Sequence, residues 1–421
     1  MAVSAPSTAR DRRLLRELAK RRLEIAHDPV NLERRQAWLD LHSGAPSRPM
    51  VLAEWGGIRE ASPPFDPELR CVDGWAQGLE RALRQDIWVF EELRDDHAFE
   101  PFLDRRWHVS TTGYGVEPVE HRVDSDYLTA RSWDAPITDI DAQFDLLQAR
   151  TFSVDRDGTL AAKSRLEDAL GDILPVRMRG GFWWTMGMTI QAIRLIGLEG
   201  LMLTMYDDPD GLHRIMRFLC DDHLVFAQWL EDEGLLSLNN EADYVGSGSC
   251  GYTHDLPRAA ESSSDPVAMA DLWVLLESQE TVGVGPTQFE EFIFPYQAEI
   301  AERFGLVYYG CCEPVHTRWD VVRRFPGLRS VSIAPLCNEA IMAEAMGSDY
   351  VYSRKPNPTL ISTPRFDEAL IRKDLRTTLE LTAANGCPVE IAMKDVHTLE
   401  NEPRRLSRWV ELAREEIART S

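Results

Sequence analysis

Short apolar runs alternate with longer amphipathic stretches from residue 173 to the end of the chain, and this rhythm constrains the fold more than any other feature. An apolar run bounded by turn residues predicts a buried strand, and apolar residues spaced three and four apart predict a helix. Strands that alternate with helices form a parallel sheet wrapped by helices. The predicted strands are 173–178, 235–238, 270–276, 306–309, 330–334, 350–353 and 389–393, and the helices predicted between them include 188–205 and 287–303.

The first 170 residues are less regular. Asp28 followed by Pro29 predicts the start of a helix that ends near Gly44, because proline is favoured at the first helical position. Residues 49–55 resemble a first buried strand. We therefore expect an N-terminal helical extension over residues 1–45 and a single (β/α)8 barrel over residues 46–421, with an open doubly wound sheet as the alternative. No glycine-rich phosphate loop follows any predicted strand, which disfavours the nucleotide-binding sheet.

The charge balance excludes several kinds of partner. The 421-residue chain has a formal net charge of -23, whereas binding to nucleic acids and anionic membranes depends on Lys and Arg. No apolar run reaches the roughly 18 residues that span a bilayer, and no apolar segment follows the basic N-terminus, so we expect no membrane span and no secretory signal. Seven cysteines, an odd number, fit free thiols in a reducing cytoplasm.

Two adjacent thiols follow the predicted strand at 306–309. The run is Tyr308-Tyr309-Gly310-Cys311-Cys312-Glu313-Pro314, and His316 comes two residues later. Thiolates beside an oxygen or imidazole ligand are the groups that zinc prefers, so Cys311, Cys312 and His316 are candidate metal ligands. The alternative is that both cysteines are small buried hydrophobic residues at a tight turn.

Polar and aromatic residues also follow the other predicted strands. In parallel barrels the active site lies in the loops after the strand carboxyl ends, although loop solvation alone places polar residues there, single lysines are often surface cations and tryptophans are often core residues. The Gly- and Ser-rich segment 244–257 is interpreted as a mobile loop beside this mouth, a lid more than a phosphate cradle. Candidate catalytic residues are Glu280, Glu313, Lys394 and Asp395, and candidate substrate-binding residues are Trp55, Arg179, Trp183, Asn240, Lys355, Asn357 and His397.

Three passages resemble the uroporphyrinogen decarboxylase superfamily. They are the run from Val284 to Gln297, the strand that ends in Cys311-Cys312-Glu313, and the later run from Ser353 to Pro358. The resemblance covers residues 170–421 and implies a single (β/α)8 barrel. One branch of the superfamily decarboxylates a tetrapyrrole without a cofactor. Another branch moves methyl groups between a corrinoid and a thiol or other acceptor, using zinc held by a His-x-Cys pair after strand six and by a later Cys.

The chain departs from both branches but lies closer to the corrinoid-linked methyltransferases. The arginine motif of the decarboxylases is absent between Met50 and Arg59, and Gly310-Cys311-Cys312 stands in place of His-x-Cys. Lys394-Asp395-Val396-His397 stands where the later Cys is expected. A zinc here would therefore use Cys311 or Cys312 with a different set, drawn from Glu280, Glu313, Cys337, His316 or His397. The Asp-x-His-x-x-Gly motif of corrinoid proteins is absent, so a corrinoid (cobalamin) would arrive on a separate partner protein.

These observations lead to one functional hypothesis and two alternatives. The first is zinc-assisted methyl transfer involving a corrinoid or a methylated small molecule and a thiol or similar acceptor, with zinc as Lewis acid. The second is a metal-free decarboxylase or lyase that acts on a small carboxylate, with lysines as anion clamps. The third is a binding module that carries a tetrapyrrole without catalysis.

Overall fold

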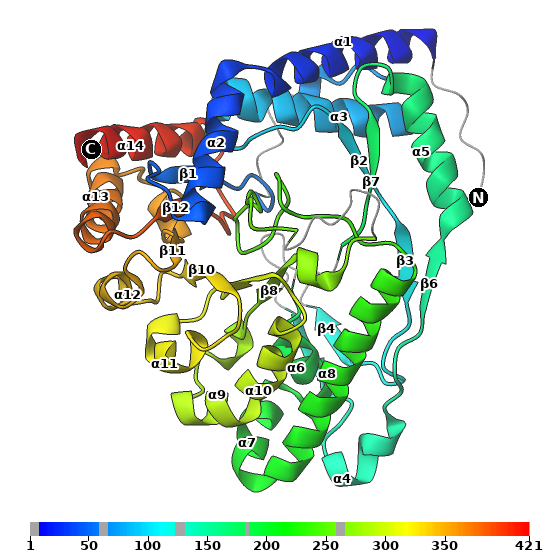
Figure 1. The fold of residues 1–421 in the computed structure, drawn as a ribbon, viewed down its shortest axis with the longest axis vertical. Helices are drawn as coiled ribbons and strands as arrows, with labels where there is room; N and C mark the ends of the chain where they lie inside the picture. Colours follow the sequence, from blue (N-terminus) through cyan, green and yellow to red (C-terminus); the bar gives the residue numbers. More distant parts are fainter. Residues whose placement is uncertain (1–7, 59–65, 123–130, 182–184, 258–265, 421) are drawn as a thin grey trace.

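A six-stranded parallel sheet forms the centre of the computed structural model, which describes residues 8–58, 66–122, 131–181, 185–257 and 266–420 (Figure 1). Neighbouring strands pair in the order β1-β12-β11-β10-β9-β8. The prediction of a parallel sheet with alternating helices is thus confirmed. The strands are β1 (Met50–Ala53), β8 (Trp273–Leu276), β9 (Leu306–Tyr309), β10 (Leu328–Ile333), β11 (Val351–Arg354) and β12 (Val389–Met393).

Helices cover the outer side of this sheet and extend beyond it. The helix predicted to begin at Asp28-Pro29 is confirmed: the Asp28 carboxylate accepts the Val30 N–H, and Gly44 ends the helix in the left-handed conformation. The helices are α1 (Ala9–Ala26), α2 (Pro29–Ser43), α3 (Gly74–Trp88), α4 (Ile140–Gln143), α5 (Arg156–Leu170), α6 (Thr189–Ile196), α7 (Leu198–Asp207), α8 (Pro209–Asp232), α9 (Pro286–Phe292), α10 (Phe294–Ala301), α11 (Trp319–Val322), α12 (Glu339–Met346), α13 (Glu368–Asn385) and α14 (Arg404–Thr420).

Two predicted helices are each divided in two. The stretch 188–205 breaks at Gly197, whose φ of 79° is a backbone conformation that glycine adopts without strain. The stretch 287–303 breaks at Ile293, where α9 ends, and Pro295 lies in the first turn of α10 because a proline there needs no hydrogen-bond partner for its nitrogen.

The predicted strand at 235–238 has no ladder in the structure. The side chain of Asn239 replaces it: the Trp273 N–H donates to its Oδ1 at 2.9 Å, and its Nδ2 donates to the Trp273 carbonyl at 3.0 Å. The ladder bonds of the described strands form an open sheet, so closure into an eight-stranded barrel stays a prediction.

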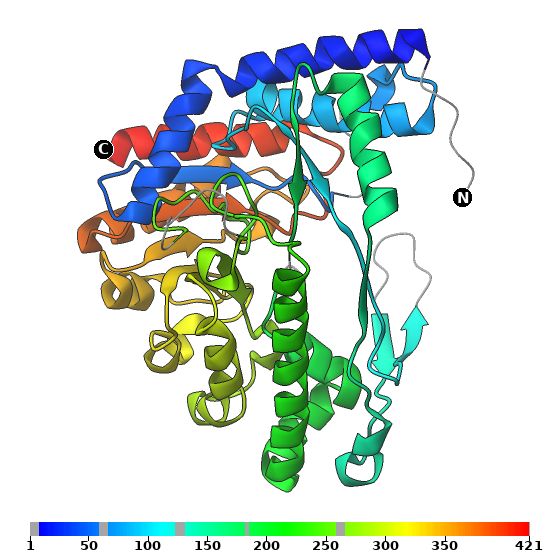
Figure 2. The ribbon, with the colours of Figure 1, turned by 45° about the vertical axis from the view of Figure 1, so that its right-hand side comes forward.

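Residues 103–179 form separate two-stranded sheets at one side of the molecule (Figure 2). One pair is parallel and two pairs are antiparallel, so this region does not continue the alternation seen after residue 173. The strands are β2 (Leu103–Arg106) with β7 (Val176–Arg179), β3 (His108–Thr111) with β6 (Phe152–Asp155), and β4 (Val119–Arg122) with β5 (Arg131–Asp134). Within the described residues, every helix is too short or too polar to cross a lipid bilayer.

One buried carboxylate ties the N-terminal helices, the sheet and the C-terminal helix together. Asp96 is 0% exposed; its carboxylate accepts the Val51 N–H of β1 at 2.7 Å and hydrogen bonds from Arg48 and from Arg414 of α14 at 2.9 Å. Its backbone carbonyl accepts the Trp38 indole N–H of α2. Burial raises the pKa of Asp96, but the two guanidinium groups outweigh burial and hold the pKa below its usual range.

We predict that Asp96→Asn destabilises the fold by about 3–5 kcal/mol, because it leaves two guanidinium groups without their shared buried anion. Urea unfolding followed by circular dichroism measures this. The folded pKa is depressed, so the contribution of Asp96 is present above the unfolded pKa of about 3.9 and is lost as pH falls below it. The difference in the free energy of unfolding between the wild type and Asp96→Asn should therefore become smaller as the pH falls.

Asp320→Asn is the matched control, because the Asp320 side chain is 92% exposed and a surface change of this kind costs within about 0.5 kcal/mol. A cost for Asp96→Asn equal to that of the control would contradict the role assigned to Asp96.

Candidate active site

Charged groups and thiols gather at the edge of the sheet where the parallel strands end. The carboxyl ends of parallel strands meet at one edge, which places residues far apart in sequence side by side. Cys311 and Cys312 follow β9, and Lys394 follows β12. Glu277 directly follows β8 and is 0% exposed.

A second buried carboxylate fixes the backbone around the thiols. Glu313 is 0% exposed, and its two oxygens accept the N–H groups of Ser278 and Cys311, each at 2.8 Å. Ser278 follows β8 and Cys311 follows β9, so one side chain joins the ends of neighbouring strands. Burial raises the pKa of Glu313. The predicted catalytic residue Glu313 thus lies beneath the thiol pair and holds it in place.

The two sulfur atoms of Cys311 and Cys312 lie 3.6 Å apart. Cys311 is buried and Cys312 is exposed. The hydrogen bond between the two thiols lowers the pKa of Cys312 and raises that of Cys311; the charge of Lys394 also lowers the pKa of Cys312. The Lys394 ammonium lies 3.9 Å from the Cys311 sulfur. The arrangement therefore favours a thiolate on the exposed sulfur.

Lys394 keeps its charge although it is buried. Burial lowers its pKa, but Tyr244, Cys311 and the carboxylates of Asp395 and Glu54 raise the pKa above its ordinary value. Its ammonium donates to the Ser247 hydroxyl at 2.7 Å and lies 3.8 Å from Asp395.

The segment 244–252 is packed into the strand ends, where a mobile lid was expected. A side chain at Gly246 would overlap the Tyr308 ring, and Gly248, with a φ of 81°, lies against Glu54 and Lys394. Ser247 contacts the Cys311 sulfur at 3.4 Å, and Ser249 donates to Glu390 at 2.8 Å. Glycines are needed here because the backbone approaches the sheet too closely for side chains.

Lys355 and Glu390 form a buried polar group under this segment. Ser353 donates to Glu390 and accepts a hydrogen bond from Lys355, whose ammonium lies 4.0 Å from a Glu390 oxygen. Tyr308 shares a 2.8 Å hydrogen bond with Ser353. Burial lowers the pKa of Lys355 to about 8, although Glu390 opposes the shift. Lys355, predicted to bind substrate, is therefore enclosed by protein groups.

Glu277 is a buried acid that faces the same strand ends. Burial, together with the nearby carboxylates of Glu280 and Glu313, raises its pKa well above the ordinary value. Its Oε1 is buried and has no hydrogen-bond partner among the described residues. Glu280, a predicted catalytic residue, accepts a 2.6 Å hydrogen bond from Thr189 of α6.

The predicted zinc ligands are only partly brought together. His316 accepts the Asn338 N–H at 3.2 Å through Nδ1, and the Cys337 thiol donates to the Glu313 carbonyl. Across the described residues, no cluster of three or more His, Cys, Asp or Glu side chains is suited to hold a metal ion. The two thiols alone do not complete the three-ligand set of a catalytic zinc site, so zinc stays a prediction.

The other predicted residues divide into structural and exposed groups. Arg179 pairs with Asp104 and Asp243, Asn240 donates to the Leu256 carbonyl, and Asn357 accepts the Thr359 N–H. These contacts hold loops in place. Asp395 and His397 are exposed in the segment after β12, and Trp183 lies outside the described residues.

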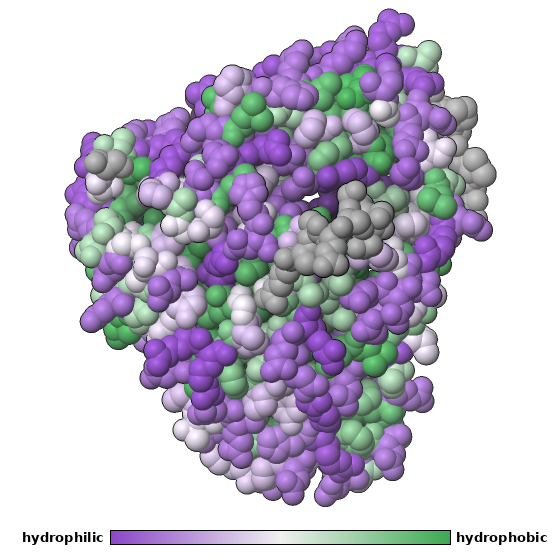
Figure 3. Space-filling view, viewed as in Figure 1, coloured by the Kyte–Doolittle hydropathy of each residue, from purple (hydrophilic) through white to green (hydrophobic). Residues whose placement is uncertain are grey.

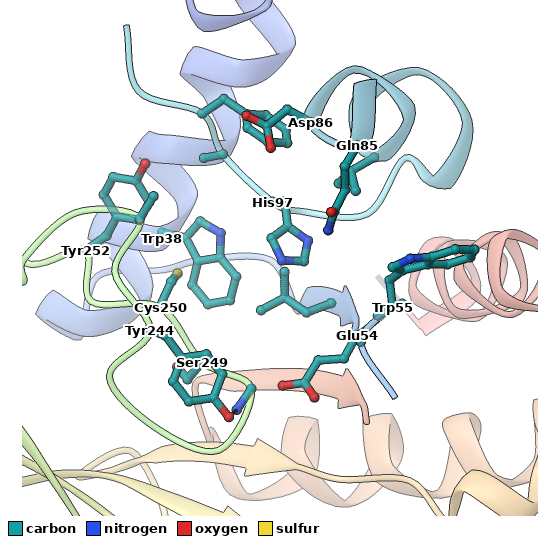
Figure 4. Close-up of a pocket in the computed structure, with 18 residues that line it drawn as sticks. Trp38, Glu54, Trp55, Gln85, Asp86, His97, Tyr244, Ser249, Cys250 and Tyr252 are labelled. Atoms are coloured by element: carbon teal, nitrogen blue, oxygen red, sulfur yellow. Dashed lines mark hydrogen bonds between the residues drawn. The ribbon is translucent and has the colours of Figure 1, made fainter. Parts of the chain in front are cut away.

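A cavity of about 430 Å³ lies beside the thiol site, between the end of β1, α3 and the segment 242–252 (Figure 4). Trp55, a predicted substrate-binding residue, lines it together with Glu54, His97 and Tyr244. Trp55 also packs on Trp88, with ring centroids 4.7 Å apart. The outer surface of the face in Figure 3 is mainly hydrophilic, with small scattered apolar patches.

The sequence interpretation missed two groups of this region. Asp95 and His97 lie in the polar run 94–97, which follows a further helical turn (Val89–Leu93) after α3, and that run was the available signal. Glu390 is a carboxylate inside an otherwise apolar strand, an unusual position that predicts a buried partner.

Comparison with known proteins gives a likeness in structure but no match in sequence. No family model matches the sequence, and no curated protein matches it. Among solved structures, a methyltransferase from Methanosarcina mazei has 13% sequence identity and a TM-score of 0.48, over 91% of this chain and 99% of that chain.

We predict that Cys312 is the first cysteine to react with iodoacetamide, and that its rate rises with pH around a midpoint below the ordinary thiol pKa of about 8.5. Cys311→Ala should raise this midpoint, because the variant loses the thiol that is hydrogen-bonded to Cys312. Mass spectrometry of peptides after timed quenching measures the rate at each cysteine.

Cys387→Ala serves as the control, because Cys387 is a buried thiol that donates to the Ala343 carbonyl on the far side of α12. An unchanged midpoint in Cys311→Ala would show that the thiol pair does not set the reactivity.

Proposed function

We propose that this protein is a methyltransferase whose reaction centre is the Cys311–Cys312 pair. The observation that carries the proposal is an exposed thiol in contact with a second, buried thiol, beside a buried ammonium group. The sequence also resembles the corrinoid-linked methyltransferases, in which a cysteine follows the corresponding strand. This resemblance supports the same reaction class.

In the proposed reaction, the Cys312 thiolate acts as general base toward an acceptor thiol. The S–H proton of the acceptor passes to Cys312, and the electron pair of that S–H bond stays on the acceptor sulfur. The acceptor thiolate then forms a bond to the methyl carbon of the donor, while the donor's bond to that carbon breaks and its electron pair leaves with the donor. Cys312 returns its proton to solvent. Proton transfer between two thiols of similar pKa is close to balanced, which favours general-base catalysis.

Lys394 stabilises the negative charge during this reaction. Its ammonium is held by Ser247 and lies next to Cys311, so its position does not depend on substrate. A fixed cation in a water-poor site stabilises developing charge without reorganisation. Asp395, exposed and 3.8 Å from Lys394, is placed to contact a polar group of the substrate.

Zinc, and a corrinoid delivered on a partner protein, stay predictions from the resemblance. The thiol pair would supply two sulfur ligands, and the reaction above needs only the pair itself.

The proposal also includes closure of the sheet into a (β/α)8 barrel. Two hydrogen bonds to the edge strands of the sheet support closure. The Asp96 N–H donates to the Val51 carbonyl of β1, and the Met186 N–H donates to the Leu275 carbonyl of β8.

We predict that the protein transfers a deuterated methyl group from free methylcobalamin to 2-mercaptoethanol, and that Cys312→Ala lowers kcat/KM by about 100-fold or more. The rate should rise with pH through the depressed pKa of Cys312, because the deprotonated form is active. Mass spectrometry of the labelled thioether measures turnover, and Cys387→Ala is the matched control. The proposal fails if Cys312→Ala turns over like the control. Release of carbon dioxide from a small carboxylate, dependent on Lys394 and intact in Cys312→Ala, would instead support the decarboxylase.

Metal content tests the zinc prediction separately. Protein purified without chelator should hold about one zinc per chain if the pair is part of a zinc site, and Cys312→Ser should lower this content. A content below about 0.2 per chain that is unchanged in Cys312→Ser would contradict zinc binding at the pair.

A further inference from the structure

The cavity beside the thiol site has acidic and aromatic walls. Its charged lining residues are the carboxylates of Glu54 and Asp86, and no Lys or Arg lines it among the described residues. Asp86 forms an ion pair with Arg22 at 2.7 Å, and Arg22 is not one of the lining residues. Glu54 therefore supplies the unbalanced negative charge of the cavity.

Glu54 is half-buried, and one of its carboxylate oxygens lacks a partner among the described residues. Its Oε1 is buried and has no hydrogen-bond partner in the described part of the chain. The charges of Lys394 and Lys355 act on Glu54, but both ammonium groups donate to serine hydroxyls, and neither forms an ion pair with Glu54 in the described part of the chain. A cationic ligand in the cavity would give this carboxylate a direct partner.

His97 faces the centre of the cavity, between Trp38, Gln85 and Glu54 (Figure 4). Its Nδ1 bonds to Asp95 at 2.7 Å, and Asp95 is 0% exposed. Asp95 also accepts the backbone N–H groups of Ala53 and His97. A carboxylate on Nδ1 fixes the ring orientation and leaves Nε2 to meet a ligand.

We propose that this cavity binds a small organic ammonium ion, with Glu54 as its counter-charge, Trp55 and Tyr244 as its accessible aromatic walls and the Asp95–His97 pair as its polar contact. Aromatic faces attract organic cations, and these two rings are the accessible ones of the lining, because Trp38 and Tyr252 are buried. The volume of about 430 Å³ is in the range of small-molecule sites. The site does not depend on the proposed methyl transfer.

Binding at this site depends on the charge of His97. The groups that face His97 are Asp95, Glu54 of the β1 end, Arg34 of α2 and Asp86 of α3. Burial and Arg34 lower its pKa, but Asp95 and Glu54 outweigh them and raise it above the ordinary value. A protonated His97 repels a bound cation, so affinity should increase as pH rises through this pKa.

Choline and 3,3-dimethylbutan-1-ol are matched probes, because they share a shape and a hydroxyl while only choline carries a charge, which does not change with pH. Isothermal titration calorimetry, with tryptophan fluorescence as a second readout, should give at least about tenfold tighter binding of choline. Glu54→Gln should remove most of that difference. His97→Gln should retain choline binding at pH 8 and lose the rise in affinity between about pH 6 and 8.

Glu411→Gln is the matched control, because the Glu411 side chain is 61% exposed on α14, and circular dichroism checks that each variant is folded. Equal affinity for the two probes, or unchanged choline binding in a folded Glu54→Gln, would overturn the proposal. Cys312→Ala should bind choline like the wild type, so loss of methyl transfer and loss of cation binding can be told apart.

Discussion

The buried carboxylate of Glu313 is the interaction on which the geometry of the strand ends depends. Its two oxygens are occupied by the N–H groups of Ser278 and Cys311, which belong to the ends of neighbouring strands. An unsatisfied N–H in such a place costs about 1–3 kcal/mol, so this contact keeps both turns in one arrangement. Because Cys311 is fixed through its own backbone, its sulfur stays in reach of Cys312 on one side and Lys394 on the other. The thiol pair is thus positioned by the fold before any substrate arrives.

The segment 244–252 completes this arrangement from the other side. It is inserted among the strand ends, with Ser247 on Cys311 and Lys394 and Ser249 on Glu390. The following residues of the segment, Gly248 and Ser249, also line the cavity that Glu54 and His97 line. One segment therefore forms a wall shared by the thiols and the cavity.

The sequence predicted the parts of the structure that local pattern controls. Apolar runs bounded by turns located the strands of the parallel sheet, and the rule that such strands end at one edge brought Cys311, Glu313 and Lys394 together before the fold was known. The prediction of a strand at 235–238 was wrong, because the side chain of Asn239 makes the hydrogen bonds to Trp273 that the backbone of a paired strand would make. Asp95 and His97 were missed because their roles depend on contacts with β1, which local pattern does not reveal. Likewise, Arg179 ends β7 and Asn357 lies in the loop after β11, yet their hydrogen-bond and ion-pair partners are structural.

The two lysines at the strand ends differ because their surroundings differ. Lys355 is enclosed beside Glu390, and burial lowers its pKa to about 8, whereas the groups around Lys394 preserve its charge. Lys394 donates to the Ser247 hydroxyl, and because an ammonium group has three N–H donors, it can also meet an anionic group. Its ammonium lies beside the thiols, 3.9 Å from the Cys311 sulfur. Gly248 packs against both Lys394 and Glu54, and the Glu54 carboxylate is one of the groups that raise the pKa of Lys394. The cavity and the thiol pair therefore share one set of charges at the strand ends.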